Sequence, residues 1–326
     1  MKKRGHSSSF HLVTGAFGYS GSYIARALLA AGEEVRTLTG RDSAGHELEN
    51  LVAAYPLDFA NPEELCRSMR GARVLYNTYW VRFSEAGFSQ AEAVRNTKLL
   101  FDCARKVGVE RIVHVSITQP SMDSPFEYFR GKAELEAALG EVGVPYTILR
   151  PAVIFGGEDI LINNIAWSLR HLPIFGIFGD GEYQLQPIHV EDLARLAVRA
   201  GNATGSEIVQ AVGPTVLTYQ ELVRGLSKAM GLRRPVVPVP TWFGLWASRL
   251  IGRLVHDVTL TREEVGALMA NLLLPTEEER TRPSSVGRID IKEWMKKNAE
   301  TLGRSYANEL ARRERMRLST ATKQPA

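Results

Sequence analysis

The stretch Leu12–Ala31, LVTGAFGYSGSYIARALLAA, decides the fold of this chain. A short apolar strand at Phe10–Val13 runs into a turn with Gly15, Gly18 and Gly21, and an apolar helix follows at once. This order is typical of a dinucleotide-binding unit, because glycines let the backbone approach a pyrophosphate and the helix amides attract its charge. The glycines are spaced more loosely than in the usual G-x-G-x-x-G pattern, so a strand-to-helix turn that binds nothing is the alternative.

Strand and helix patterns alternate through the first half of the chain, which predicts an α/β fold with a doubly wound parallel sheet of the Rossmann type. Strands are expected at Phe10–Val13, Glu34–Leu38, Ala53–Leu57, Val74–Tyr76, Arg111–Val115 and Tyr146–Leu149, and helices at Ser22–Ala31, Pro62–Met69, Ala91–Val107 and Phe126–Glu141. After Pro151 the pattern loosens, and a smaller C-terminal substrate domain is expected. The expected boundaries are a flexible N-terminus over 1–9, a dinucleotide-binding domain over 10–155 to which elements near 186–213 return, a mainly substrate-binding domain over 156–318 and a disordered tail over 319–326.

Composition limits the function classes. The 326 residues are 44% hydrophobic, enough for a sizeable core, and the net charge of +4 comes largely from the two ends. No nucleic-acid-binding signature accompanies that charge. The two cysteines form no C-x-x-C pair, so we expect neither a metal site nor a disulfide framework, and a reducing, cytoplasmic location. No secretory signal or membrane-spanning run is apparent.

The catalytic candidate is Tyr128-x-x-x-Lys132. Ser124 and Pro125 are a typical helix start, which would place both side chains on one face of an early helical turn. A lysine cation beside a phenol lowers the pKa of the phenol, so Tyr128 would serve as an acid/base near neutral pH. Ser116, at the end of the strand VHVS, would hydrogen-bond a substrate oxygen. The alternative is a chance pair on a solvated helix face.

In this order the motifs resemble the short-chain dehydrogenase/reductase superfamily, in its extended or atypical branch. TGAFGYSG is similar to the glycine turn of that family, the block VRNTKLLFDCARKVGVERIVHVS to its fourth helix and fifth strand, and LRPAVIFG to the wall of its nicotinamide pocket. The resemblance implies that Ser116, Tyr128 and Lys132 are the catalytic trio. The short loop between Ser116 and Tyr128 departs from the family, and Thr118 or Ser121 would be the substitute. In detail the chain resembles an atypical subgroup that includes the nucleotide-binding accessory subunit of respiratory complex I.

Cofactor choice rests on the end of the second strand, LTGRDS. Arg41 stands where NAD-preferring sites carry an acid, and a guanidinium there would pair a 2′-phosphate, so NADP(H) is favoured and NAD(H) is the alternative. Asp42 argues for NAD, and Arg41 as a plain solvated residue is the third option. The glycine turn and the resemblance together give the expected cofactor-binding residues: Gly15, Phe17, Gly18, Tyr19, Gly21, Arg41, Asp58, Phe59, Asn77, Thr78, Lys132 and Pro151.

Two functions follow from these motifs. The first is an NAD(P)-dependent oxidoreductase or epimerase acting on a small molecule such as a sugar, a lipid or a quinone-related compound. The second is a non-catalytic NAD(P)H-binding accessory, assembly or sensor protein. The segment 242–255 is amphipathic with interleaved arginines, which suits a membrane surface or a partner; we favour a core helix of the substrate domain. The basic stretch 304–317 is expected to be a solvated helix.

Overall fold

The computed structural model describes residues 9–41, 43–84, 89–281 and 285–311. The chain divides into two compact units. Among the described residues, the first unit runs to Arg150 and also takes in Ala194–Val209, and the second comprises Pro151–Leu193 and residues 210–311. The flexible N-terminus expected over 1–9 falls almost wholly outside the described residues, and the tail expected over 319–326 falls entirely outside them.

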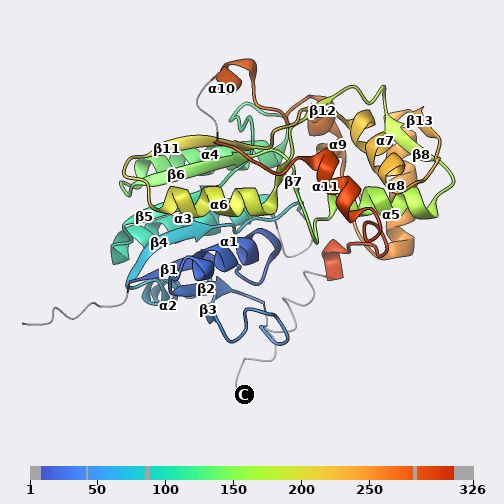
Figure 1. Cartoon of the computed structure of the whole chain (residues 1–326). Helices are drawn as coiled ribbons and strands as arrows, with labels where there is room; N and C mark the ends of the chain where they lie inside the picture. Colours follow the sequence, from blue (N-terminus) through green and yellow to red (C-terminus); the bar gives the residue numbers. More distant parts are fainter. Residues whose placement is uncertain (1–8, 42, 85–88, 282–284, 312–326) are drawn as a thin grey trace, which may run out of the picture. The chain divides into compact units, whose positions relative to one another are not determined.

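A parallel sheet forms the centre of the first unit (Figure 1). The strand order is β3-β2-β1-β4-β5-β6, and β11 and the two-residue β14 extend it. The strands are β1 (Phe10–Thr14), β2 (Val35–Thr39), β3 (Ala53–Pro56), β4 (Ala72–Asn77), β5 (Arg111–Val115), β6 (Tyr146–Pro151), β11 (Glu207–Val212) and β14 (Ser285–Val286). The predicted doubly wound sheet is therefore confirmed, and each of the six expected strands lies within two residues of its predicted bounds.

Helices cover this sheet because its strands are apolar on both faces, as in parallel sheets generally. They are α1 (Tyr19–Ala30), α2 (Pro62–Ser68), α3 (Gln90–Val107), α4 (Glu127–Glu141) and α6 (Val190–Gly201). Side-chain oxygens of Asn61 and Ser89 accept from the first-turn amides of α2 and α3, and α3 ends at the left-handed Gly108. Leu12, Leu75 and other sheet residues pack with the inner faces of the helices in one buried cluster.

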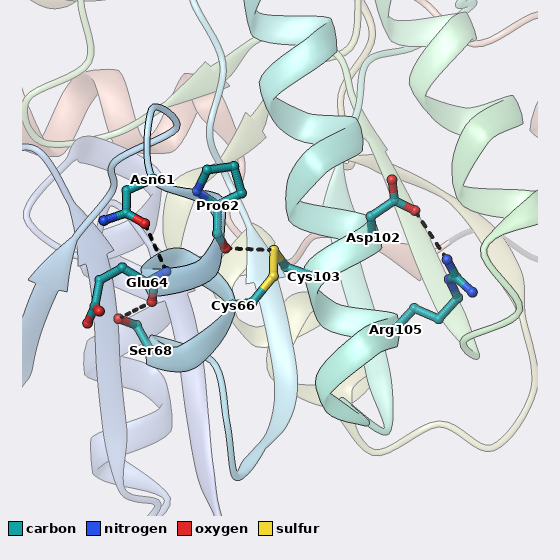
Figure 2. The surroundings of a disulfide bond; sticks show 8 residues. All are labelled: Asn61, Pro62, Glu64, Cys66, Ser68, Asp102, Cys103 and Arg105. Atoms are coloured by element: carbon teal, nitrogen blue, oxygen red, sulfur yellow. Dashed lines mark hydrogen bonds and ion pairs between the residues drawn. A yellow bond between two sulfur atoms is a disulfide. The ribbon is translucent and has the colours of Figure 1, made fainter.

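A disulfide joins two of these helices. Cys66 of α2 and Cys103 of α3 are bonded across 37 residues of sequence (Figure 2). The expectation that the two cysteines form no disulfide was wrong. The prediction relied on sequence spacing alone, whereas the sulfurs meet because α2 and α3 pack side by side on the sheet. The bond therefore links two elements that their own hydrophobic contacts already hold together.

The second unit combines short strands with helices. Its strands are β7 (Ile154–Phe155), β8 (Phe175–Phe178), β9 (Gln184–Leu185), β10 (Ile188–His189), β12 (Leu217–Thr218) and β13 (Val236–Val239), and its helices are α5 (Leu161–His171), α7 (Tyr219–Ala229), α8 (Thr241–Val255), α9 (Arg262–Met269), α10 (Glu277–Thr281) and α11 (Ile291–Asn298). Residues of α5, α7 and α11 form its core around Phe155 and Leu222. Among the residues that the structure describes, no helix is both long enough and apolar enough to span a membrane.

Candidate functional site

The glycine-rich turn joins β1 to α1 as predicted. Gly15 adopts a left-handed conformation with φ of 69°, and its carbonyl oxygen accepts from the amide of Gly18 at 2.7 Å. A Cβ at Gly21 would lie 2.2 Å from that same oxygen, so only glycine lets α1 pack this closely against the turn. No side chain caps α1 in the described part of the chain, and its first turn carries no acid. These features fit the pyrophosphate of a dinucleotide, because the helix N-terminus attracts an anion.

The ends of β1 and β4 support this turn. Thr78 donates its hydroxyl to the carbonyl of Thr14 at 2.6 Å, which places Thr78 next to Gly15. Asn77 is fully buried, its amide donates to Nδ1 of His114 at 3.0 Å, and its oxygen accepts from Thr14. Asn77 thus links the ends of β1, β4 and β5 by hydrogen bonds. Thr78, which lies next to Gly15, is closer to the glycine-rich turn where the dinucleotide is predicted to bind.

Arg41 lies across the glycine-rich turn. It follows β2, and its Nη1 donates to the carbonyl of Phe17 at 3.1 Å. Its guanidinium carbon lies 3.8 Å from the point that a Cβ on Gly18 would occupy. The cation predicted to select NADP(H) is therefore placed at the turn that would hold the phosphates. Asp42, which argued for NAD, lies outside the described residues.

Other expected cofactor residues lie around this turn and beyond it. Phe17 is buried against His46, and Tyr19 begins α1 with its ring edge-on to Tyr23. Asp58 is exposed, and its carboxylate accepts from the amide of Ala60 at 2.9 Å, so it stabilises the turn before α2. Phe59 and Tyr79 place their ring centres 5.0 Å apart, and Pro151 is buried at the end of β6.

Tyr128 and Lys132 lie one turn apart on α4, as the spacing predicts. The helix begins at Glu127, and its cap residue is Phe126, whose amide donates to the Ser124 hydroxyl at 3.3 Å. Ser124 therefore stabilises the turn before the helix. It was predicted to start the helix as its N-cap, but Phe126 occupies that position. This difference leaves Tyr128 in the first turn of α4.

Lys132 is only 2% exposed. Its Nζ donates to the carbonyl of Val115 at 2.9 Å and lies 4.3 Å from the centre of the Trp80 ring and 6.0 Å from that of Tyr128. Burial lowers the pKa of the Lys132 amine to about 7, although Glu136 acts to raise it. The amine is therefore a group that titrates near neutral pH beside an aromatic pair, since Trp80 meets Tyr128 edge-on at 5.5 Å.

With this geometry established, comparisons show which proteins the chain resembles. Residues 15–164 match the family model for NAD(P)H-binding domains. The chain is 26% identical over 69% of its length to NADH dehydrogenase (ubiquinone) 1 alpha subcomplex subunit 9 of Dictyostelium discoideum, and 28% identical over 64% to the Arabidopsis thaliana protein of that name. The family model covers 150 of the 326 residues, a little under half of the chain.

The aligned region covers only part of each of these relatives. The matches span 66% of the Dictyostelium protein and 55% of the Arabidopsis protein, so the chain covers less than two thirds of either relative. Among solved structures, an NADPH-dependent quinone oxidoreductase from Escherichia coli superposes with a TM-score of 0.71 at 17% identity, covering 88% of this chain and 98% of that one. That structural likeness shows that the two proteins share a fold.

Sequence reasoning missed the immediate partners of Ser116. Its hydroxyl donates to Oε1 of Glu136 at 2.5 Å, and Glu136 forms an ion pair with Arg150 at 2.6 Å. The serine that the family pattern assigns to a substrate oxygen thus donates its hydrogen bond to a carboxylate. Glu136 lies one turn beyond Lys132 on α4, which is the one signal that could have placed it beside the trio. The partner Arg150, on β6, carries no local signal at all.

Proposed function

We propose that the chain is an NADP(H)-dependent oxidoreductase or epimerase that acts at a carbonyl or hydroxyl carbon of a small molecule, such as a sugar, a lipid or a quinone-related compound. The observation that carries the proposal is the buried Lys132 amine beside Tyr128, with its pKa lowered to about 7. Below that pKa the Lys132 amine is a cation in a poorly solvated place, where it would stabilise a Tyr128 phenolate more strongly than it would in water; above it the amine is neutral. Tyr128 would then move the proton at its phenolic oxygen.

A nicotinamide dinucleotide fits the turn because Gly21 leaves no room for any larger side chain and α1 presents its N-terminus there. The bound cofactor would supply or accept the hydride. Gly15, Gly18 and Thr78 would lie against its pyrophosphate and ribose, and Arg41 would pair a 2′-phosphate.

Cofactor selectivity is tested by titrating the protein with NADPH and with NADH and following nicotinamide fluorescence. Arg41→Ala should weaken NADPH binding by about 10–100-fold, because a charge-assisted hydrogen bond contributes about 1.5–3 kcal/mol, and should leave NADH binding nearly unchanged. The matched control is Arg67→Ala, an exposed arginine on α2 whose recorded partner is Glu64. Equal loss of NADPH and NADH binding in Arg41→Ala would refute the phosphate assignment.

A second function is favoured by a specific observation. The Ser116 hydroxyl donates to Glu136 instead of facing a substrate oxygen, and the curated relatives named above are subunits of NADH dehydrogenase. A non-catalytic NADP(H)-binding accessory or sensor protein would tolerate that arrangement.

Tyr128→Phe separates the two functions, because it removes the phenolic proton and leaves the glycine-rich turn intact. An enzyme should lose turnover of a carbonyl substrate by about 10²–10⁴-fold while its NADPH titration stays unchanged. Unchanged turnover in Tyr128→Phe would refute the acid/base role, and absence of turnover in the wild-type protein across a carbonyl-substrate screen would favour the accessory function.

A further inference from the structure

Helix α8 presents two apolar faces. Its inner face combines two glycines with one leucine: Gly244, Leu245 and Gly252 are buried, and a Cβ at Gly244 would lie 2.3 Å from the ring of Phe178 on β8. The helix backbone itself therefore rests on the second unit, where Figure 1 shows α8 beside β8. Large apolar residues occupy the other face, which we call the α8 stripe: Trp242, Phe243, Trp246, Leu250 and Leu254.

The α8 stripe faces solvent. Trp242 is 72% exposed, Trp246 56% and Leu254 75%, and four of its residues recur at every fourth position and so follow one line along the helix. A surface helix ordinarily turns its apolar stripe to the core and its polar side chains to water. In α8 the large apolar side chains of the stripe face water, so the expectation that 242–255 is an ordinary core helix was wrong. A contiguous exposed apolar patch of this kind marks an interaction surface.

Charge on α8 indicates which partner fits. Arg249 and Arg253 are exposed, and each lies three residues beyond a stripe residue, Trp246 and Leu250, so both flank the stripe. The sequence of α8 contains no aspartate or glutamate. Tryptophan concentrates at the boundary between lipid headgroups and acyl chains, and arginine is attracted to anionic headgroups. Exposed tryptophan and leucine, flanked on the same helix by arginine and by no acid, therefore complement an anionic lipid surface.

We propose that α8 binds the second unit to the surface of a lipid bilayer that contains anionic headgroups. The helix lies in the plane of the interface, with the α8 stripe among the upper acyl chains and Arg249 and Arg253 at the headgroup phosphates. This inference is independent of the proposed function, because it uses no residue of the glycine-rich turn or of α4.

The test is sedimentation of the full chain with vesicles of phosphatidylcholine, with and without 30% phosphatidylserine, at low and high salt. The expected result is binding that needs phosphatidylserine, weakens with salt, and shifts tryptophan emission to the blue. The double variant Trp242→Ala, Trp246→Ala should bind at least about tenfold more weakly for each tryptophan removed. Arg249→Gln and Arg253→Gln should each cost about fivefold on anionic vesicles only.

Matched controls are Leu51→Ala and Met122→Ala, exposed apolar residues of the first unit, and Arg105→Gln, an exposed arginine of α3. Each control should bind vesicles as the wild-type protein does. Quenching of wild-type tryptophan fluorescence by brominated lipid gives a readout that needs no variant. Absence of vesicle binding would overturn the proposal, as would binding that the tryptophan variant leaves unchanged. A dimer that dissociates in the tryptophan variant, seen by light scattering without vesicle binding, would show that a second copy covers the stripe instead.

Discussion

Replacing Gly21 with alanine tests the close packing that makes the glycine-rich turn. The new Cβ would lie 2.2 Å from the Gly15 carbonyl oxygen and 2.7 Å from its carbonyl carbon. Both are backbone atoms of a turn that is itself hydrogen-bonded to Gly18, so no side chain can rotate away to make room. The start of α1 must move outward by about an ångström to reach ordinary contact distance. Inserting a methylene into a packed site costs about 1–3 kcal/mol.

The assay combines thermal unfolding with the NADPH titration. We expect the Gly21→Ala melting temperature to fall by about 2–4 °C per kcal/mol lost, and NADPH affinity to fall at least about tenfold, because the amides at the N-terminus of α1 move away from the turn. Gly205→Ala is the control, since no atom lies within 4 Å of its added Cβ and its φ is not positive. If Gly21→Ala matched Gly205→Ala in both readouts, the structural reasoning would be refuted.

Three further predictions concern α4 and the disulfide. The Lys132 pKa is about 7 in the folded state against 10.5 ordinarily, so between pH 7 and pH 10.5 the unfolded chain binds more protons than the folded one. The free energy of unfolding should therefore rise with pH in this range by up to about 1.4 kcal/mol per pH unit. Urea titrations should show that this contribution vanishes in Lys132→Met. Glu136→Gln should lower the free energy of unfolding by about 3–5 kcal/mol because it removes the negative charge of the largely buried pair with Arg150. Glu134, also on α4, pairs on the surface with Lys98 of α3, so Glu134→Gln should cost under about 1 kcal/mol; equal costs would contradict the burial argument. Reducing the Cys66–Cys103 bond should cost about 4 kcal/mol by loop entropy, measured as urea midpoints with and without dithiothreitol, and a Cys66→Ala variant that still responded to reductant would contradict this origin.

The sheet and its helices could be predicted because their signals are local. Apolar runs mark the strands, Asn61 and Ser89 mark helix starts, and glycines mark the turn after β1. The start of α4 differs from the prediction because the Ser124 hydroxyl accepts from the amide of Phe126 in the preceding turn, and the helix begins only at Glu127; helix ends are commonly uncertain by one or two residues.

The missed features depend on residues that are distant in sequence. Glu136 reaches Ser116 and Arg150 only because α4 packs beside the ends of β5 and β6. The cysteines meet across two helices for the same kind of reason. The sequence of α8 did not show which of its faces is exposed, because the helix is apolar on both sides. The glycines at the inner contact, such as Gly244, carry no hydrophobic signal that would mark that face as buried.

The segment Ala194–Val209 belongs to the first unit although 43 residues assigned to the other unit precede it. The buried side chain of Arg111 ties it in place by donating to the carbonyls of Ala200 at 2.6 Å and Gly205 at 2.8 Å. During synthesis, a nascent chain that has emerged only as far as Arg150 would leave β6 as an open sheet edge and Arg111 without these acceptors. The first unit can therefore cover the β6 edge fully only after Val212, the end of β11, leaves the ribosome, and a gene fragment ending near residue 150 should yield an aggregating product.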